Sequence, residues 1–405
     1  MKTPITFALI QERKNPPDRR AVFSPKKFAE ARKRFPDANF IIEASPIRIF
    51  DDADYAKEGF EVTEDLKNAD VLLGVKEVPI EALIPNKKYF FFSHTIKKQH
   101  YNRELLKAVL EKNIELYDHE VITAQNGARL IGFGRYAGLV GAYNGLRAWG
   151  LRDKTYILPK AEGLADLWAI KKELQKIILP PIKICLSGSG RVAHGAQEIL
   201  DFMKIEQVGV ADYLNRAYKK PVYCLIDVMD YNKRKDGKRG KGIDFFRDPT
   251  PYVSDFFRLA TVTDLFIAGH FYGDGAPFLF TRADAKKDDF NIKVIADISC
   301  DIDGPVASTL RPSTIDAPLY GYDPKTETET AFDAPGAITV MAVDNLPCEL
   351  PRDASEGFGE LFLKDVLPAF FNGDEDGILE RARMTQNGQL TERFNYLQDY
   401  VDGKE

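Results

Sequence analysis

Short apolar runs alternate along the chain with longer amphipathic stretches. In the first third, runs of strand length lie at residues 5–10, 39–44, 71–75, 89–94 and 114–118. Between them, residues 26–35 and 102–113 repeat apolar positions with the period of a helix. Further strand-like runs lie at residues 183–187, 222–227, 264–269, 293–299 and 337–343. This alternation predicts an α/β fold with parallel, doubly wound sheets covered by helices.

The end of the chain differs, because residues 354–400 have a helical pattern and no strand-like run. We expect this tail to pack on a unit that is already built. At 405 residues the chain is too long for one ordinary core, so its length predicts two domains.

Composition excludes several classes of partner. Charged residues make up 29% and hydrophobic residues 44%, and the net charge of −5 implies no general attraction to nucleic acid or to anionic membranes. The basic run at 232–242 has glycines and no aromatic residues, so we expect a solvated loop there. No run approaches the ~20 apolar residues of a membrane span, and the apolar stretch at the N-terminus is too short for a signal peptide. We expect a soluble, cytoplasmic protein.

The four cysteines, Cys185, Cys224, Cys300 and Cys348, form no CxxC pair and no metal-ligand spacing. They are typical of reduced, mostly buried thiols. Residues 297–304, DISCDIDG, resemble a calcium loop but lack the glycine and glutamate positions of an EF-hand. We expect no metal site.

The most informative stretch is 183–200, KICLSGSGRVAHGAQEIL, in which an apolar run enters a glycine turn and an amphipathic helix leaves it. Gly188 allows a tight turn, and Gly190 lets the backbone approach a pyrophosphate held by amides at the helix start. Gly195 comes two residues later than in the usual G-x-G-x-x-G fingerprint, so a structural glycine turn is the alternative. The residues expected to hold a dinucleotide here are Gly188, Ser189, Gly190, Arg191 and Val192.

The next strand-like run, EQVGVAD, ends in Asp212, 24 residues after Gly188. A carboxylate at the end of this strand would bind the ribose and repel a 2′-phosphate, which argues for NAD. Arg216 and Lys219 lie close enough in sequence to offset that charge. The sequence therefore leaves the cofactor as NAD or NADP.

Two candidate acid/base residues follow predicted strands directly. Lys76 comes after VLLGV and His94 after YFFFS, and ligands of open α/β sheets bind beyond the carboxyl ends of strands. Burial lowers the pKa of a lysine, and a histidine titrates near neutrality, so the pair could exchange protons with a carbonyl or imine. The alternatives are a surface lysine paired with Glu77 or Glu81 and a histidine satisfied in the core.

Three further cations are candidates for binding substrate carboxylates. Arg20 follows the first strand, Arg129 lies in NGARLIGFG, and Lys97 comes three residues after His94. An arginine can hold a carboxylate through two parallel hydrogen bonds. Each of the three could equally be an exposed cation.

Seven segments together resemble the lysine-ketoglutarate reductase half of the bifunctional aminoadipic semialdehyde synthases, and more distantly saccharopine and alanine dehydrogenases. They span the chain from Asp18 to Gly359 in order and read DRRAVFSP, LGVKEVP, FFSHTIKKQ, ARLIGFGRYAG, SGSGRVAHGAQ, IADISCDIDG and VDNLPCELPRDASEGFG. The resemblance implies two Rossmann-like domains with a cleft between them. It assigns residues 1–134 and 346–405 to a substrate domain and 135–345 to a dinucleotide-binding domain.

The resemblance also implies site residues and chemistry. Lys76 and His94 match the family's acid/base pair, and the substrate-binding cations fall on Arg20, Lys97 and Arg129. Asp301, Asp344 and Asn345 match residues beside the nicotinamide. The implied reaction condenses L-lysine with 2-oxoglutarate and reduces the imine with NAD(P)H to give saccharopine. Arg135, within FGRYAG, departs from the family by placing a charge where a neutral residue is expected.

Two other functions remain open from the sequence. One is a different amino-acid dehydrogenase of the same fold, because fold does not fix substrate. The other is a regulator that binds NAD(P)H without turnover, against which the retained Lys76, His94, Arg20 and Arg129 argue. The oligomeric state, the direction of the reaction and its regulation are not predicted.

Overall fold

The computed structural model describes residues 4–404. The chain divides into two compact units. Unit 1 consists of the described residues up to Phe133 together with those from Pro351 onward, and unit 2 is Gly134–Leu350. The cleft implied between two domains stays a prediction.

Unit 1 is built on a six-stranded parallel sheet with the order β3-β2-β1-β4-β5-β6. The strands are β1 Thr6–Leu9, β2 Asn39–Glu43, β3 Glu61–Thr63, β4 Val71–Leu73, β5 Lys88–Phe91 and β6 Glu115–Asp118. All five strand-like runs of the first third are strands, and β3 is an additional edge strand. The chain order reverses at β1, as in doubly wound nucleotide-binding folds, so the predicted fold class is confirmed for this unit.

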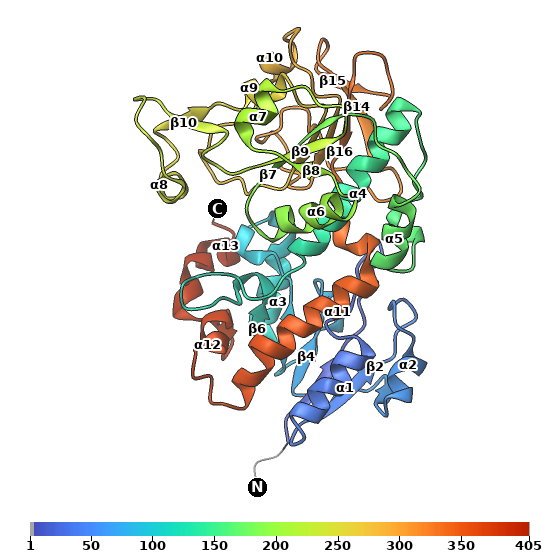
Figure 1. Cartoon of the computed structure of the whole chain (residues 1–405). Helices are drawn as coiled ribbons and strands as arrows, with labels where there is room; N and C mark the ends of the chain where they lie inside the picture. The colour runs from blue at the N-terminus through green and yellow to red at the C-terminus, as the bar shows by residue number, and fades with distance from the viewer. Residues whose placement is uncertain (1–3, 405) are drawn as a thin grey trace. The chain divides into compact units, whose positions relative to one another are not determined.

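Helices cover the sheet of unit 1. They are α1 Pro25–Arg34, α2 Asp52–Lys57, α3 Arg103–Glu111, α11 Pro351–Leu361, α12 Ile378–Ala382 and α13 Gln398–Asp402. Ser24 caps α1 by accepting a hydrogen bond from the Lys27 amide, and Phe28 and Ala31 face the core. The C-terminal α11 lies beside α1 (Figure 1).

The C-terminal tail packs on unit 1, as expected, but the expectation that it lacks strands is wrong. Strands β17 Thr385–Gln386 and β18 Gln389–Leu390 form a small hairpin. Asn387 and Gly388 both have positive φ at its turn, which is the backbone that an Asn-Gly pair favours. Thr385 Oγ1 accepts a hydrogen bond from the Leu116 amide of β6, so the hairpin continues the edge of the sheet.

Unit 2 contains an eight-stranded sheet with the order β15-β14-β16-β13-β12-β7-β9-β8. Its strands are β7 Lys183–Ser187, β8 Glu206–Gln207, β9 Val222–Ile226, β12 Leu265–Ala268, β13 Val294–Asp297, β14 Leu319–Asp323, β15 Thr328–Thr330 and β16 Ile338–Met341. The predicted runs at residues 183–187, 222–227, 264–269, 293–299 and 337–343 are all strands, whereas the run expected to end at Asp212 is a strand only over Glu206–Gln207. Only β14 and β15 run antiparallel to their neighbours. The chain order reverses at β7, so unit 2 is also a doubly wound domain.

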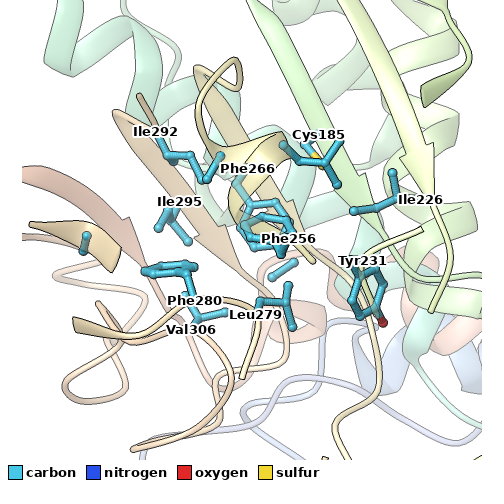
Figure 2. Packing of buried hydrophobic residues seen from close by; sticks show 14 of the residues in the cluster. Cys185, Ile226, Tyr231, Phe256, Phe266, Leu279, Phe280, Ile292, Ile295 and Val306 are labelled. Carbon is cyan, nitrogen blue, oxygen red and sulfur yellow. The ribbon is translucent and has the colours of Figure 1, made fainter. Parts of the chain in front are cut away.

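The helices of unit 2 are α4 Gly134–Asp153, α5 Leu167–Leu174, α6 Arg191–Phe202, α7 Val210–Asn215, α8 Gly242–Arg247, α9 Phe257–Ala260 and α10 Arg282–Ala285. Phe256, Phe266 and Phe280 fill the core on one side of the sheet, with Ile295 and Val306 beside them (Figure 2). Aromatic side chains of this size dominate the apolar area that a core buries.

Helices α4 and α6 pack closely because glycines lie at their contact. A Cβ on Gly138 would lie 1.9 Å from the Val192 carbonyl oxygen, and one on Gly195 would lie 2.0 Å from the Arg135 carbonyl oxygen. Gly195, the displaced third glycine of the turn, thus serves helix packing. The unexpected charge of Arg135 is matched by Glu198 of α6, with Nε and Nη2 each donating to one carboxylate oxygen.

The basic run at 232–242 is only partly the expected loop. Its first residues form β10 Asn232–Arg234, which pairs antiparallel with β11 Tyr252–Ser254. Lys233 contacts Asp255 at 2.8 Å, so acidic partners lie within the same hairpin region.

Among residues 4–404, no helix is both long enough and apolar enough to cross a membrane.

Candidate active site

The side chains predicted to act on a substrate follow the carboxyl ends of neighbouring strands in unit 1. Arg20 lies in the loop after β1, Lys76 follows β4, His94 follows β5, and Arg129 lies after β6. Because β1, β4, β5 and β6 are adjacent and parallel, these segments leave the same edge of the sheet. Lys97 ends the short 3-10 turn that begins directly after His94. All five predicted residues therefore belong to one edge of unit 1.

Lys76 is partly buried at this edge and is not the surface lysine of the alternative interpretation. Burial, together with the nearby charges of Arg20 and Lys14, lowers the pKa of the Lys76 ammonium below its ordinary value. Glu77 and Asp18 oppose this shift in part. Lys76 can therefore exchange a proton closer to neutral pH than an exposed lysine can.

Glu12, a buried carboxyl, fixes the backbone at Lys76. Its two oxygens accept hydrogen bonds from the amides of Val75, at 2.6 Å, and of Lys76, at 2.8 Å. Burial and the neighbouring Asp18 raise the pKa of Glu12 to about 7, although the two amides and Arg20 favour its charged form. The carboxyl therefore determines where the Lys76 side chain starts.

Arg20 is buried, with 3% of its surface exposed, so the exposed-cation alternative is wrong for this residue. Its Nε and Nη2 donate to the two oxygens of Asp18 at 3.0 and 2.6 Å. The guanidinium also lies 4.2 Å from the centre of the Phe133 ring. The edge of the Arg20 guanidinium formed by Nε and Nη2 is therefore already bonded to a carboxylate of the chain itself.

His94 lies between two carboxylates. Its Nδ1 is 3.4 Å from Glu120 Oε2, and its Nε2 is 3.7 Å from Glu77 Oε1. The residue has a left-handed backbone with φ of 56°, which a non-glycine residue adopts seldom. Both ring nitrogens of His94 therefore face a carboxylate, and the imidazole lies at the same sheet edge as Lys76.

Glu120 joins three of the predicted residues. Besides His94, its carboxylate lies 3.5 Å from Lys97 Nζ and 3.7 Å from Arg129 Nη2. Burial alone would raise the pKa of Glu120, but the hydrogen bond with His94 and the charges of Lys97 and Arg129 lower it to about 2. Glu120 is thus ionised throughout the physiological pH range and holds the cluster together.

Asp118, at the end of β6, positions the two segments that carry this cluster. Its Oδ2 accepts hydrogen bonds from the amide and the hydroxyl of Ser93, the residue before His94. Its Oδ1 accepts one from the Glu120 amide at 2.7 Å. The side chain of Asp118 is completely buried, so both loops are fixed by a group that solvent does not reach.

His119 is a histidine of the core, the kind of residue that the alternative interpretation expected His94 to be. It is fully buried beside Phe92 and Phe358, and its Nε2 lies 2.9 Å from the Gly74 carbonyl oxygen. Burial lowers the pKa of His119 to about 4, so it stays neutral. His94, with its two carboxylates and partial exposure, is of a different kind.

Sequence reasoning assigned no role at this edge to the carboxylates of Glu12, Asp18, Asp118 and Glu120, and it named Glu77 only as a possible partner of a surface lysine. Glu77 directly follows Lys76, Glu120 comes two residues after β6, and Asp18 comes two residues before Arg20. Acidic residues beside predicted catalytic cations were a usable signal for Glu77 and Asp18, and for Glu120 the signal was a carboxylate just beyond a predicted strand end. Glu12 had no such signal, because its role depends on the turn after β4 folding back on β1.

The glycine turn of unit 2 fits a dinucleotide. Gly188 has φ of +110°, and a Cβ there would lie 2.5 Å from the Gly269 carbonyl oxygen, so the turn requires glycine. Gly190 has an extended backbone that any residue can adopt, and a Cβ there would meet nothing within 4 Å. The absence of a side chain at Gly190 therefore leaves open space at the start of α6.

That open space faces a helix terminus suited to an anion. Gly190 is the N-cap of the 12-residue α6, and no side chain of the described chain caps it. Ser189, Gly190 and Arg191 are exposed, and Val192 is partly exposed. Amides at an uncapped helix start, together with the helix dipole, bind phosphate groups.

The expected strand ending at Asp212 is wrong. The strand in that region, β8, covers only Glu206–Gln207 at the sheet edge, and Asp212 lies in the following α7. There it pairs with Arg216, one turn later, at 3.2 Å. Gly209 and the helix-compatible VADYLN that follows it end the strand early, so Asp212 is not at a strand end beside the glycine turn.

Asp227 has the position that had been expected for Asp212. It directly follows β9, the strand paired with β7, and the Gly188 amide donates to the Ile226 carbonyl oxygen at 2.9 Å. Asp227 is exposed, and its Oδ1 accepts from the Met229 amide at 2.7 Å. The sequence did contain the signal, because the predicted strand VYCLID ends in this carboxylate.

A buried polar pair lies where the sheet order of unit 2 reverses. Ser187 Oγ, at the end of β7, is 2.9 Å from His270 Nδ1, just after β12. Burial lowers the pKa of His270 to about 4, so the ring is neutral. Its Nε2 has no hydrogen-bond partner among residues 4–404. Sequence reasoning missed this pair.

The remaining predicted residues follow the other strands of the same sheet. Asp301 lies in the loop after β13, and Asp344 and Asn345 lie after β16. β13 and β16 are parallel to β12, so both loops leave the carboxyl edge that also carries the glycine turn. Asp344 is exposed, and Asp301 and Asn345 are partly exposed.

Comparison with known proteins places this geometry in context. Residues 8–140 match the family described as alanine dehydrogenase/PNT, N-terminal domain. The chain is 27% identical to an alpha-aminoadipic semialdehyde synthase of Arabidopsis thaliana over 96% of its own length and 41% of that protein. It is 26% identical to a saccharopine dehydrogenase [NAD(+), L-lysine-forming] of Yarrowia lipolytica, over 91% of this chain and 93% of the other.

The fold has a solved counterpart. An L-alanine dehydrogenase superposes over 98% of this chain and all of the other chain, with a TM-score of 0.66 and 16% identity. The chain spans less than half the length of the semialdehyde synthases that it matches. Over nearly its whole length the chain is thus similar to aminoadipic semialdehyde synthases and saccharopine dehydrogenases and has the alanine dehydrogenase fold, which confirms the resemblance seen in its sequence motifs.

Proposed function

We propose that the chain is a nicotinamide-dependent oxidoreductase that condenses L-lysine with 2-oxoglutarate to saccharopine, or catalyses the reverse reaction. The carboxyl edge of unit 1 carries this proposal. A lysine of lowered pKa and a histidine between two carboxylates lie there beside two partly exposed cations. Reductive amination needs such a set, because water leaves through proton transfers and the keto acid brings two carboxylates.

Lys76 and His94 form the acid/base pair in this proposal. When the substrate amine attacks the keto carbon, one group must take the amine proton and another must protonate the oxygen that leaves as water. The lowered pKa of Lys76 lets it accept a proton. His94, which lies between Glu77 and Glu120, would donate a proton to the leaving oxygen.

Lys97 and Arg129 bind the substrate carboxylates. Their side chains are 53% and 49% exposed, so they can reach a ligand while Glu120 keeps them oriented. Arg20 shares one edge of its guanidinium with Asp18, so a substrate carboxylate can use only what remains of its fork. We assign its main effect to the charge that it places near Lys76.

Unit 2 is the dinucleotide-binding domain in this proposal, and unit 1 is the substrate domain. The open space at Gly190 and the start of α6 would hold the pyrophosphate, with Asp301, Asp344 and Asn345 beside the nicotinamide. A bound reduced nicotinamide would supply the hydride that reduces the imine. Asp227 would bind the ribose hydroxyls and favour NAD over NADP, and the Yarrowia lipolytica relative is named for NAD(+).

The test is a screen of amino acid and keto acid pairs with NADH and NADPH, followed through the absorbance of the reduced nicotinamide. We expect the highest kcat/KM with L-lysine and 2-oxoglutarate. A higher kcat/KM with another pair would replace the substrate assignment, and binding of the cofactor without turnover of any pair would identify a sensor. The cytoplasmic location stays a prediction.

A further inference from the structure

A pocket of about 350 Å³ lies in unit 1 and contains none of the residues assigned to catalysis or substrate binding. Three segments form it: the hairpin at residues 122–130, the end of the helix around residues 364–372, and residues 376–381 with the start of α12. Its volume is in the range of sites that hold small molecules.

Charged side chains of both signs line this pocket without neutralising one another. Lys364, Asp365, Asp376 and Arg381 all contribute to its wall. None of the four forms an ion pair with any residue between 4 and 404. Two cations and two carboxylates therefore surround one space and remain available to a ligand.

Arg381 shows how this arrangement is maintained. Its Nε and Nη2 donate to the Thr123 carbonyl oxygen at 3.3 and 2.9 Å, and its Nη1 donates to the Asp376 carbonyl oxygen at 2.7 Å. These contacts fix the guanidinium against two walls of the pocket. Because backbone carbonyls are neutral, the positive charge is not cancelled, and two of the five N–H groups of an arginine stay outside these bonds.

The third wall has an irregular backbone. Residues Phe362–Val366 form a turn of π-helix, and Leu367–Phe370 continue as a 3-10 helix. Pro368 has no N–H group, so the α-helical bond to the residue four positions earlier cannot form there. Short π-turns inside helices are frequent at functional sites. Apolar lining comes from Leu130, Pro368 and Ile378.

We propose that this pocket binds a free, neutral α-amino acid in its zwitterionic form. Lys364 and Arg381 would hold the carboxylate, and Asp365 and Asp376 would hold the ammonium group. The apolar residues of the wall suit a small uncharged side chain, and the balanced charge of the wall matches a ligand of zero net charge.

Binding there would reach the active site through the hairpin that forms one wall. Ala124 and Gln125 line the pocket, and Arg129 pairs across the same hairpin with Thr123. The Ala124 amide donates to the Ala128 carbonyl oxygen at 2.9 Å, so the hairpin moves as one piece. This second part rests on the proposed function: an amino acid in the pocket would change KM for the keto acid through Arg129.

Isothermal titration of the full chain, without cofactor or keto acid, tests the binding. The probes are L-alanine and L-valine, compared with N-acetyl-L-alanine, which lacks the ammonium group, and L-alaninamide, which lacks the carboxylate. We expect binding of the two amino acids and at least about tenfold weaker binding of both analogues, because a charge-assisted hydrogen bond is lost in each. Equal binding of either analogue would overturn the zwitterion assignment.

Variants locate the bound probe. Lys364→Met and Asp365→Asn should each weaken binding of L-alanine at least about tenfold, whereas Lys33→Met, an exposed lysine on α1, should not. Unchanged binding in Lys364→Met, or loss of binding in His94→Gln alone, would assign the probe to another site and overturn the proposal. Because no turnover is measured, these outcomes do not depend on whether the chain is an oxidoreductase.

Discussion

Glu349 is a buried carboxyl whose protonation should limit the stability of unit 2. It has 2% of its surface exposed and accepts a hydrogen bond from Asn144 Nδ2 at 2.8 Å. Burial is the main cause that raises its pKa to about 7, with Glu162 adding to the shift and Arg147 and Lys160 opposing it. At neutral pH the group is therefore shared between a neutral and a charged form.

The sign and size of the effect follow from this shift. Below the unfolded value of 4.5 both states are protonated, and Glu349 costs nothing. As the pH rises toward 7, the unfolded chain loses the proton first, so stability falls. Well above pH 7 the free energy of unfolding is lower by about 3 kcal/mol than at pH 4.5. This figure follows from a difference of roughly 2.5 pKa units between the folded and unfolded states, at about 1.36 kcal/mol for each unit.

Glu349→Gln removes the titration and keeps an oxygen that can accept from Asn144. We expect little difference in Tm from the parent protein near pH 4.5 and a gain of about 6 to 12 °C near pH 8 for the unfolding of unit 2. Scanning calorimetry across this range measures it, with the exposed Glu206→Gln as control. A gain that is the same at both pH values would refute the buried, protonated carboxyl.

Three further predictions concern the binding residues. Gly190→Val should abolish NADH binding in a fluorescence titration without lowering Tm, because its Cβ meets only open space in the protein; unchanged affinity would reject the turn as the pyrophosphate site. Asp227→Asn should reduce the ratio of kcat/KM for NAD over NADP, while Asp212→Asn, which removes a charge paired with Arg216, should leave it unchanged; the opposite result would restore Asp212. Arg129→Ala should raise KM for the keto acid about tenfold or more with a smaller effect on kcat, since a carboxylate clamp binds ground and transition states alike; a fall in kcat alone would contradict this role.

The fold was largely predictable because its signals are local. Apolar runs such as those that became β1 and β7, and the alternation with helices, depend on neighbouring residues alone. The strandless tail was a wrong expectation because the hairpin at Asn387-Gly388 has only two residues on each side. Strands this short leave no alternating pattern to detect.

The candidate site was predictable where a residue follows its strand directly. Lys76 and His94 were found in this way, because parallel strands bring their carboxyl ends to one edge. The strand position expected for Asp212 was wrong because a real signal, a carboxylate at a suitable spacing, was assigned to a strand that stops at Gln207. Which strand pairs with β7 is set by tertiary packing, and this decides that Asp227 is the residue beside the turn.

The buried carboxylates could not be predicted, because their environments are made by distant segments. Glu12 acquires its role only when the turn after β4 folds against the end of β1. Glu349 differs from an exposed glutamate only through its burial beside α4. Neither environment has a signature in the neighbouring sequence.

The central claim is that Lys76 and His94 transfer protons in the chemical step, and kcat of their variants tests it most directly. Lys76→Met and His94→Gln are compared with Lys88→Met, at the opposite end of β5, and with the exposed His100→Gln. With L-lysine, 2-oxoglutarate and saturating cofactor, kcat should fall by about 10² to 10⁴ in each of the first pair and stay near the parent value in the controls. Near-normal kcat in both Lys76→Met and His94→Gln would contradict the account.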